Sequence, residues 1–288
     1  MGTDNPQYFS YFLTCTDFLV SGEEFKLLYD RNKDMLVTAP QPSAEELPQY
    51  YQSEDYISHT DSKKSIIDRL YQVVKAIMLK RKIRLLETFY PQKGNILDIG
   101  AGTGDFLKAA QKSGWKIHGV EPNEKARKVA ENKNISLNKD SEKFHEGQFE
   151  VITLWHVLEH IPDLKNQIAE LERLLKKDGV LIIAVPNFKS HDAKYYKEFW
   201  AAYDVPRHLW HFSKNAIEIL FGAAGFELIK TLPLKFDSYY VSLLSEKNKS
   251  GKSNFLKAFQ IGWMSNLKAY SSGEYSSLIY ILKKKASK

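Results

Sequence analysis

Between residues 95 and 185 the chain alternates short apolar runs, each the length of a strand, with segments that have a helical hydrophobic period. Strands that alternate with helices indicate a parallel sheet joined by right-handed crossovers. The sequence therefore predicts an α/β fold whose mostly parallel sheet carries helices on both faces. A last apolar run at residues 277–282 follows a mixed segment, and we expect it to add an antiparallel strand at the edge of the sheet.

The first strand-to-helix turn of this sheet is rich in glycine and reads Asp98-Ile99-Gly100-Ala101-Gly102-Thr103-Gly104. Glycine tolerates tight turns and lets a ligand approach the main chain, while the N-terminus of the next helix carries a partial positive charge. Ligands of open α/β sheets bind at this edge, outside the carboxyl ends of the strands. We therefore predict a ligand site that comprises Asp98, Gly100, Ala101, Gly102 and Gly104.

Three acidic residues indicate the class of ligand. A dinucleotide fingerprint requires glycine at position 105, where this chain has Asp105, and a carboxylate there would repel a pyrophosphate. Asp98, at the end of the strand, can accept charge-assisted hydrogen bonds from a ligand ammonium. Glu121 ends the next strand, 21 residues beyond Gly100, and matches the acid that holds ribose hydroxyls. The pattern favours a nucleoside that carries an ammonium group and lacks phosphate over NAD.

Three runs carry a resemblance to a known family: residues 96–104, the segment His118-Gly119-Val120-Glu121-Pro122, and residues 151–160. In these runs the chain resembles a class I S-adenosylmethionine-dependent methyltransferase, and the third run is similar to the ubiquinone-biosynthesis O-methyltransferase group. The resemblance covers about residues 62–288. It implies a seven-stranded, Rossmann-like sheet with an antiparallel last strand. It also implies an enzyme that transfers a methyl group from S-adenosylmethionine to a small-molecule acceptor by in-line displacement.

The resemblance further implies how the donor site is completed. Asp140, after a weak third strand at residues 135–138, approaches the adenine amino group, and Pro122 lies beside the donor. Leu154, Trp155 and the histidine that follows them line the donor pocket. Two alternatives stay open: a nicotinamide-dependent oxidoreductase, which Asp105 disfavours, and a non-catalytic nucleotide-binding module. The acceptor lies beyond the sequence, because one fold serves many substrates.

Residues 1–60 form an N-terminal arm ahead of the methyltransferase domain at residues 61–288. The arm resembles a zinc ribbon found on relatives of this family, but it keeps Cys15 alone where those relatives have paired cysteines. Structural zinc sites prefer thiolate and imidazole ligands, so the neighbouring Asp17, Asp30 and Asp34 are poor substitutes. We expect an arm that has lost its metal and packs as a lid or a partner surface.

A histidine-containing segment follows the strand at residues 149–154. His156-Val157-Leu158-Glu159-His160 matches the H-x-x-E-H signature of zinc proteases, but Pro162 interrupts the helix that such an enzyme needs. Members of the ubiquinone group can bind a divalent metal through an acidic and histidine cluster in this segment. This chain has His156 at one of those positions instead of a carboxylate, and we expect no metal.

A second segment, residues 199–212, is aromatic and contains His208 and His211. We place it over the acceptor site, where aromatic walls exclude water; packing against the N-terminal arm is the alternative. Histidine titrates near physiological pH. His208 or His156 is therefore the expected general base, with His211 as a further candidate.

Composition limits the partners and the compartment. The net charge of +6 is mild and partly reflects a lysine-rich C-terminus, so it does not indicate a nucleic-acid partner. No apolar run approaches the roughly 20 residues that span a bilayer. A single cysteine excludes an internal disulfide, and we expect a cytoplasmic protein with a small-molecule substrate. A basic amphipathic stretch at residues 63–84 can rest on an anionic membrane, but a solvated outer face is the favoured interpretation.

Overall fold

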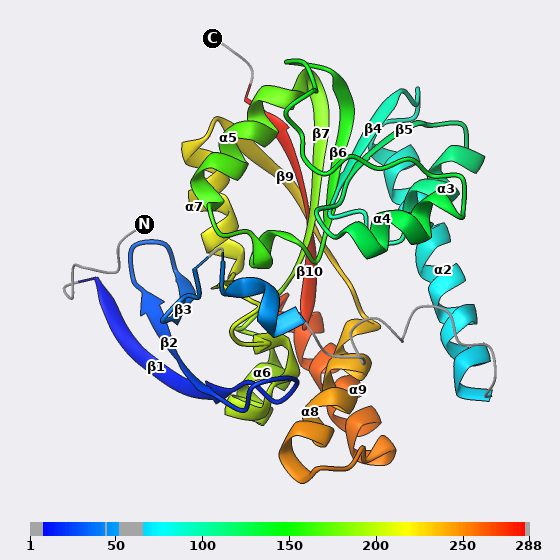
Figure 1. The fold of residues 1–288 in the computed structure, drawn as a ribbon. Helices are drawn as coiled ribbons and strands as arrows, with labels where there is room; N and C mark the ends of the chain where they lie inside the picture. The colour runs from blue at the N-terminus through cyan, green and yellow to red at the C-terminus, as the bar shows by residue number, and fades with distance from the viewer. Residues whose placement is uncertain (1–7, 44, 52–65, 286–288) are drawn as a thin grey trace.

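The computed structural model describes residues 8–43, 45–51 and 66–285, with the main chain alone at residues 66–73. Figure 1 shows a central six-stranded sheet flanked by helices, with a smaller sheet at one side. In spatial order, the strands of the central sheet are β5 (Lys116–Val120), β4 (Asn95–Ile99), β6 (Phe149–Trp155), β7 (Leu175–Pro186), β10 (Ser277–Lys284) and β9 (Phe226–Pro233).

The direction of these strands matches the expected class of fold. β5, β4, β6 and β7 are parallel, and β10 runs antiparallel to both β7 and β9. Beyond β5, a single parallel bridge between Val120 and Asn138 stands where the weak third strand is expected. The predicted α/β, Rossmann-like fold with a mostly parallel sheet and an antiparallel last strand is confirmed, with its seventh strand reduced to this bridge.

The expected place of the last strand at the edge of the sheet is wrong. β10 lies between β7 and β9, and Tyr280 pairs with Ile183 on one side and with Thr231 on the other. A strand that is covered on both faces is apolar without alternation, and the side chains of residues 277–282 are all buried. β9 takes the edge instead, and most of its side chains are partly or fully exposed.

Helices cover both faces of the central sheet. α5 (Leu164–Leu174) and α7 (Lys214–Ala223) pack on one face, where their apolar side chains join the largest core cluster. α2 (Ile66–Phe89), α3 (Asp105–Lys112) and α4 (Glu124–Glu131) contribute to a second cluster on the opposite face. The carboxyl ends of β4, β5 and β6 therefore lie at an edge of the sheet that has a helical layer on each face.

The smaller sheet joins the N-terminal arm to a distant segment. β1 (Phe9–Thr16), β2 (Glu24–Asp30) and β3 (Met35–Ala39) form an antiparallel meander, and β8 (Trp210–His211) pairs with β3. A third core cluster fills the space between this sheet and residues 188–205. The predicted boundary near residue 60 lies outside the described residues.

A helical hairpin is inserted between β9 and β10. α8 (Asp237–Ser250) and α9 (Phe255–Ser272) pack on each other and on α6 (His191–Tyr196). The described chain also contains short 3₁₀ helices, namely η1 (Leu47–Tyr51), η2 (Leu158–His160), η3 (Lys197–Phe199) and η4 (Ala201–Tyr203). Among the described residues, no helix combines the length and the hydropathy needed to cross a bilayer.

Candidate functional site

The glycine loop forms the turn between β4 and α3, and its glycines meet different surroundings. Gly100 has a φ of 68°, and a Cβ there would lie 2.4 Å from Cγ2 of Val157. Gly102 has a φ of 53°, and a Cβ there would meet nothing within 4 Å. Gly104, with a φ of 75°, precedes the first turn of α3. The open side of Gly102 leaves room for a ligand to approach the main chain.

Glu121 connects the glycine loop to the end of β5. Its Oε2 accepts a hydrogen bond from the amide of Gly102 at 2.9 Å, and its Oε1 accepts one from the amide of Asn123 at 2.9 Å. The amide of Ala101 donates to the carbonyl of Val120 at 3.0 Å. The structure thus brings together the predicted site residues from two neighbouring strand ends.

Asp98 lies at the end of β4, buried beside a lysine that the sequence analysis does not select. Its Oδ1 accepts a hydrogen bond of 2.6 Å from Oγ1 of Thr153. Burial raises the pKa of Asp98 to about 7, although the bond from Thr153 and the charge of Lys82 act in the opposite direction. Burial likewise lowers the pKa of Lys82 to about 8, against the attraction of Asp98 and Asp237. A charged group that binds beside this pair will shift both equilibria.

Lys82 extends from α2, with Nζ 4.2 Å from the ring centroid of Trp155 and 5.8 Å from that of Phe106. In the sequence it is hidden within the basic stretch at residues 63–84, which is expected to present a solvated face. The spacing of Lys82 from the apolar residues of α2 is the signal in the sequence that could have identified it. Lys82 lies four residues from the apolar Met78 and from the buried Leu86, on the side of α2 that packs into the core.

Asp105, which replaces the third dinucleotide glycine, binds two lysines at the start of α3. Nζ of Lys75 lies 2.7 Å from Oδ2, and Nζ of Lys133 lies 2.8 Å from Oδ1. Burial acts to raise the pKa of Asp105, but the two lysines outweigh it and lower the pKa. Lys75 and Lys82 therefore turn toward the domain, whereas Lys80, Arg81 and Arg84 are exposed and form the expected solvated face in the described part of the stretch.

His156 follows β6 in a left-handed conformation, with a φ of 57°. Its Nε2 lies 3.1 Å from Oδ2 of Asp237, the first residue of α8, and its Nδ1 lies 3.5 Å from Oε1 of Glu159. Burial disfavours a charged imidazole, but the two carboxylates outweigh it and raise the pKa of His156 to about 10. His156 is therefore a cation at neutral pH, and its partner Asp237 is marked by no sequence motif.

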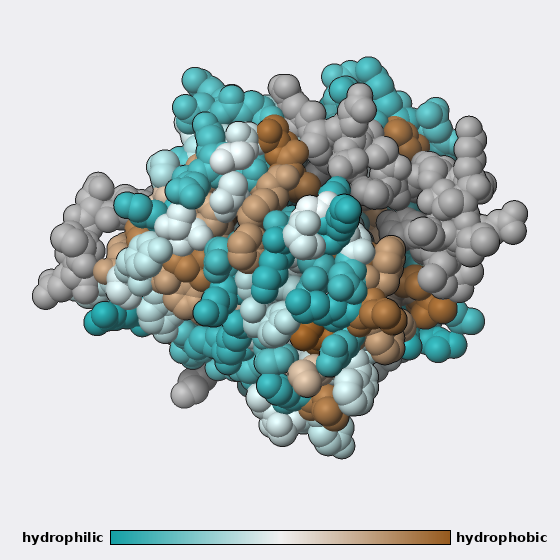
Figure 2. Space-filling view, turned by 90° about the horizontal axis from the view of Figure 1, so that it is seen from below, coloured by the Kyte–Doolittle hydropathy of each residue, from teal (hydrophilic) through white to brown (hydrophobic). Residues whose placement is uncertain are grey.

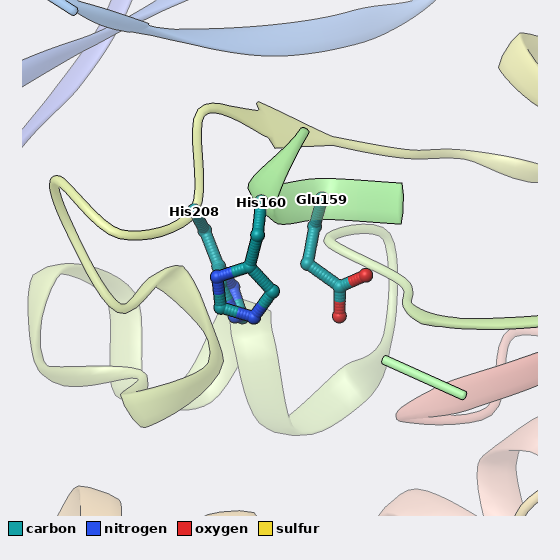
Figure 3. Close-up of side chains that lie close together, drawn as sticks. All are labelled: Glu159, His160 and His208. Atoms are coloured by element: carbon teal, nitrogen blue, oxygen red, sulfur yellow. The ribbon is translucent and has the colours of Figure 1, made fainter. Parts of the chain in front are cut away.

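Glu159, His160 and His208 lie together beyond His156 (Figure 3), and each offers a metal-binding atom within 4.8 Å of the others. Both carboxylate oxygens of Glu159 are buried without a hydrogen-bond partner. The rings of His160 and His208 meet edge to face, with centroids 4.5 Å apart. Nδ1 of His208 lies 2.9 Å from the carbonyl oxygen of Ala202, so Nε2 is the unprotonated atom of the neutral ring.

The cluster around Glu159 differs from a zinc-protease site. Its segment forms the short 3₁₀ helix η2 instead of a regular helix, and His156 contacts Asp237 outside the cluster. Nδ1 of His160 lies 3.0 Å from the hydroxyl of Tyr51 and 3.1 Å from the carbonyl oxygen of Arg207. Burial, with a smaller effect of His208, lowers the pKa of His160 to about 4, so this imidazole is neutral.

In the aromatic segment at residues 199–212, residues 200–205 pack with the N-terminal arm, which matches the alternative interpretation, whereas residues 209–212 contribute to the largest core cluster. The buried guanidinium of Arg207 lies 2.8 Å from Asp17 of the arm. His211 is also buried, with Nε2 3.0 Å from Oγ1 of Thr38, and burial lowers the pKa of His211 far below its usual value. These contacts favour a structural role for His211, whereas His208 reaches the cluster around Glu159.

The other predicted donor residues lie around the same edge of the sheet. Asp140 is exposed, two residues beyond the bridge at Asn138, and Pro122 is exposed next to Glu121. Leu154 is fully buried in the core, so it can line a ligand pocket only through its main chain. Trp155 is half-buried and meets the ring of Phe106 edge to face, with centroids 5.5 Å apart.

The three aspartates of the arm that the sequence places near Cys15, namely Asp17, Asp30 and Asp34, have protein partners. Asp17 accepts hydrogen bonds from two amides of the turn that follows it, at 2.9 and 3.1 Å. Asp30 pairs with Lys33 at 2.8 Å, and Asp34 accepts a hydrogen bond of 2.6 Å from the hydroxyl of Tyr29. In the described part of the chain, only the cluster in Figure 3 brings three metal-binding side chains within reach of one ion.

A family model described as a methyltransferase domain matches residues 70–231, which is more than half of the chain. The ubiquinone biosynthesis O-methyltransferase of Actinobacillus pleuropneumoniae serotype 5b (strain L20) is 33% identical, over 39% of this chain and 56% of the relative. That of Thiobacillus denitrificans is 31% identical, over 37% of this chain and 50% of the relative. The chain thus spans about half the length of the curated relatives it matches.

Among solved structures, a geranyl diphosphate C-methyltransferase from Streptomyces coelicolor A3(2) has a TM-score of 0.53 at 12% identity. The similarity covers 79% of this chain and 89% of that one. At such low identity the likeness concerns the fold alone.

Proposed function

The chain belongs to the methyltransferase domain family, and we propose that it transfers a methyl group from S-adenosylmethionine to a small-molecule acceptor. The resemblance to class I S-adenosylmethionine-dependent methyltransferases that the sequence carries is confirmed by this family and by the fold. One observation carries the proposal: the open main chain at Gly102 follows the buried Asp98 and donates to the buried Glu121, and these two carboxylates stand at adjacent strand ends. The family does not support the nicotinamide-dependent oxidoreductase considered from the sequence.

In the proposed donor site, each group of S-adenosylmethionine has its own partner among the side chains around the glycine loop. Asp98 binds the donor's ammonium, and Lys82 beside it binds the donor's carboxylate, so each buried charge gains an opposite partner. Glu121, held by two amides, accepts hydrogen bonds from the ribose hydroxyls. Asp140 approaches the adenine amino group, and Trp155 limits the pocket beside Lys82.

The proposed reaction is a direct displacement. A lone pair on the acceptor forms a bond to the methyl carbon, while the bond from that carbon to the sulfonium breaks and its electron pair stays on sulfur as S-adenosylhomocysteine forms. No covalent bond to the protein is required, so catalysis rests on holding the acceptor atom, the methyl carbon and the sulfur in line. An acceptor hydroxyl also has to lose a proton to a base.

His208 is the base that the geometry supports best. Its Nδ1 is engaged by the carbonyl of Ala202, which leaves Nε2 to accept a proton beside Glu159, and the Glu159 carboxylate would stabilise the imidazolium that forms. His156 is less suited, because its pKa of about 10 keeps it protonated. We assign His156 to positioning, as the cation that holds both Asp237 and Glu159.

Metal binding at the cluster around Glu159 is the alternative use of these side chains. The donor set of one carboxylate and two imidazoles fits a transition metal such as zinc. Protonated His156, however, already balances the charge of Glu159, and it stands where the ubiquinone group has a carboxylate. We therefore propose that the reaction needs no divalent metal.

The acceptor is proposed only as a class. The two curated relatives described above are named ubiquinone biosynthesis O-methyltransferases, and this name supports a small-molecule acceptor. Lys75 and Lys82 both turn toward the domain, so these two lysines do not add to an exposed basic surface of the kind that holds nucleic-acid backbones.

Transfer of isotope-labelled methyl from S-adenosylmethionine to a metabolite extract tests the proposal. We expect labelled small molecules with the unmodified protein, in the presence of a metal chelator as well as in its absence. His208→Asn should leave donor affinity unchanged, because the proposed donor-binding groups lie elsewhere. It should lower turnover by about 10²–10⁴-fold, the usual contribution of a positioned base.

Three outcomes would contradict parts of this proposal. If the protein binds the donor but labels no metabolite, it is the non-catalytic nucleotide-binding module considered from the sequence. Full activity of His208→Asn removes His208 as the base. Activity that the chelator abolishes and zinc restores assigns a metal to Glu159, His160 and His208 instead.

A further inference from the structure

The outward side of α9 is lined with large apolar side chains. Positions 256, 259, 263, 267 and 270 are spaced by three or four residues, so they fall on one side of the helix. All five are exposed, together with the residue that begins the helix, and their exposed fractions run from 53% to 87%: Phe255, Leu256, Phe259, Trp263, Leu267 and Tyr270. The helices of soluble domains usually turn their apolar side inward, and this one does the reverse.

The inward side of α9 carries small residues that fix its rotation. Gly262 approaches α8 so closely that a Cβ there would lie 2.9 Å from Cα of Tyr239. Oγ of Ser238 donates to the carbonyl of Gly262 at 3.0 Å, and Oγ of Ser265 donates to the buried carboxylate of Asp192 at 2.6 Å. Turning the apolar stripe inward would break these bonds and force large side chains into a contact built for small ones. The contacts of the inward side therefore keep the apolar side chains of α9 on the outward side.

The charge of the hairpin is positive. Residues 237–272 contain five lysines and two carboxylates. One of these carboxylates, Asp237, is engaged by His156, and the other, Glu246, is buried and pairs with Lys257 at 3.8 Å, so the positive charge of the hairpin remains in excess. Apolar side chains flanked by lysines, with a tryptophan and a tyrosine among them, are the composition of helices that lie in the surface of an anionic bilayer.

A second apolar element lies at the same end of the molecule. The turn between β1 and β2 exposes Phe18, Leu19 and Val20, each by 40% to 45%. The carboxylate of Asp17 holds this turn by accepting hydrogen bonds from the amides of Leu19 and Ser21. The ring centroid of Phe18 lies 5.9 Å from that of Phe199, next to α8. Figure 1 shows this turn and the α8–α9 hairpin at the lower end, and Figure 2 shows brown apolar residues interrupting the hydrophilic surface there.

We propose that α9 docks this end of the protein on the surface of an anionic lipid bilayer, with the turn between β1 and β2 as a second contact. Pairing of α9 with a second copy of the chain is less suited to the charge, because it would bring two sets of lysines together. The proposal needs no methyl transfer, so it is independent of the proposed function. It also assigns membrane contact to a different element from the basic stretch at residues 63–84.

Sedimentation with lipid vesicles tests the proposal on the full chain. We expect at least tenfold tighter binding to vesicles of phosphatidylcholine with 30% phosphatidylglycerol than to vesicles of phosphatidylcholine alone, and weaker binding at high salt, because anionic lipids attract the lysines. Leu256→Ser with Leu267→Ser should lower the affinity at least tenfold. The matched control, Ile219→Ser with Ile229→Ser, removes two exposed apolar side chains from α7 and β9 and should bind as the unmodified protein does.

Tryptophan fluorescence gives a second readout that locates the contact. Trp115, Trp200 and Trp210 are buried, and Trp155 is half-buried against Phe106 at the central sheet, whereas Trp263 is 53% exposed. Quenching by brominated phosphatidylcholine in the same vesicles should therefore report Trp263 and vanish in Trp263→Phe. Equal vesicle binding by both double variants, or no binding to anionic vesicles at low salt, would overturn the proposal. It would also be overturned if the protein bound no vesicles and formed a dimer that Leu256→Ser with Leu267→Ser dissociates, since a second copy would then cover α9.

Discussion

The donor edge of the central sheet and the cluster around Glu159 are assembled in different ways. At the donor edge, Asp98, Gly102 and Glu121 lie within one strand–turn–helix–strand unit, and Glu121 bonds to an amide only 19 residues away. The cluster around Glu159 depends on long-range contacts instead. Arg207 binds Asp17 across 190 residues, and Thr38 donates to the carbonyl of His208 across 170.

This difference separates two properties of the protein. The proposed donor binding rests on a local unit whose main chain is fixed by the parallel sheet. The placement of His208 rests on the docking of the N-terminal arm, which the buried pair of Arg207 and Asp17 stabilises. Substitutions can therefore damage the arm without weakening donor binding, and can weaken donor binding without loosening the arm.

The largest expected effect is on stability, from the substitution Arg207→Met. Removing one partner of a buried ion pair typically costs about 3–5 kcal/mol, because the remaining carboxylates stay buried without a counter-charge. Arg207 is almost fully buried against Asp17. Denaturant unfolding should show this loss, while calorimetry on the folded variant should show unchanged donor affinity.

Arg173→Met is the matched control, because its pair with Glu170 lies at the surface and should contribute about 1 kcal/mol or less. Equal losses of stability in the two variants would mean that the arm is not held by Arg207. A loss of donor affinity in the folded Arg207→Met protein would show that the two regions are coupled.

The substitution Glu121→Ala tests the donor edge of the central sheet. It should weaken binding of S-adenosylhomocysteine by about 2–4 kcal/mol, since it removes a charged hydrogen-bond acceptor from a mostly buried site. Glu23→Ala, which removes the carboxylate that binds the hydroxyl of Tyr50 in the arm, should leave that affinity unchanged. Calorimetry on both variants decides the matter, and unchanged affinity in Glu121→Ala would mean that the end of β5 does not hold the ribose.

A smaller effect is expected from pH. The pKa of Asp98 is raised to about 7 in the free protein, and its ionised form binds an ammonium best. The affinity for S-adenosylhomocysteine should therefore rise with pH through that value, by about eightfold between pH 6 and pH 7.5 if only ionised Asp98 binds. Asp98→Asn should bind more weakly and lose this dependence. A dependence that persists in Asp98→Asn would assign the titration to another group.

The same comparison explains how much the sequence predicts. The sheet and the donor edge follow from local rules, because strand ends in a parallel sheet meet at one edge and glycine marks the turn between them. Lys82 and Asp237 reach this edge from α2 and α8, which lie outside the strand–turn–helix unit. No motif records their approach, although the position of Lys82 on the apolar side of α2 is a usable signal.

The rest could not be predicted because it depends on pairings between distant segments. Nothing local specifies that β3 accepts β8 as a neighbour or that Arg207 reaches Asp17. The same holds for β10, whose position between β7 and β9 depends on which strands flank it. Its unbroken apolar run was evidence for an inner strand, and the late position in the chain was the misleading feature.

Calorimetry of the unmodified protein with two ligands tests the central claim most directly. The account predicts micromolar-range binding of S-adenosylhomocysteine and no comparable binding of NAD. Asp98 and Lys82 offer partners for an amino acid moiety, and Asp105, paired with Lys75 and Lys133, occupies the position where a dinucleotide fingerprint requires glycine. Tighter binding of NAD than of S-adenosylhomocysteine would contradict the donor site as it is assigned to Asp98, Gly102 and Glu121.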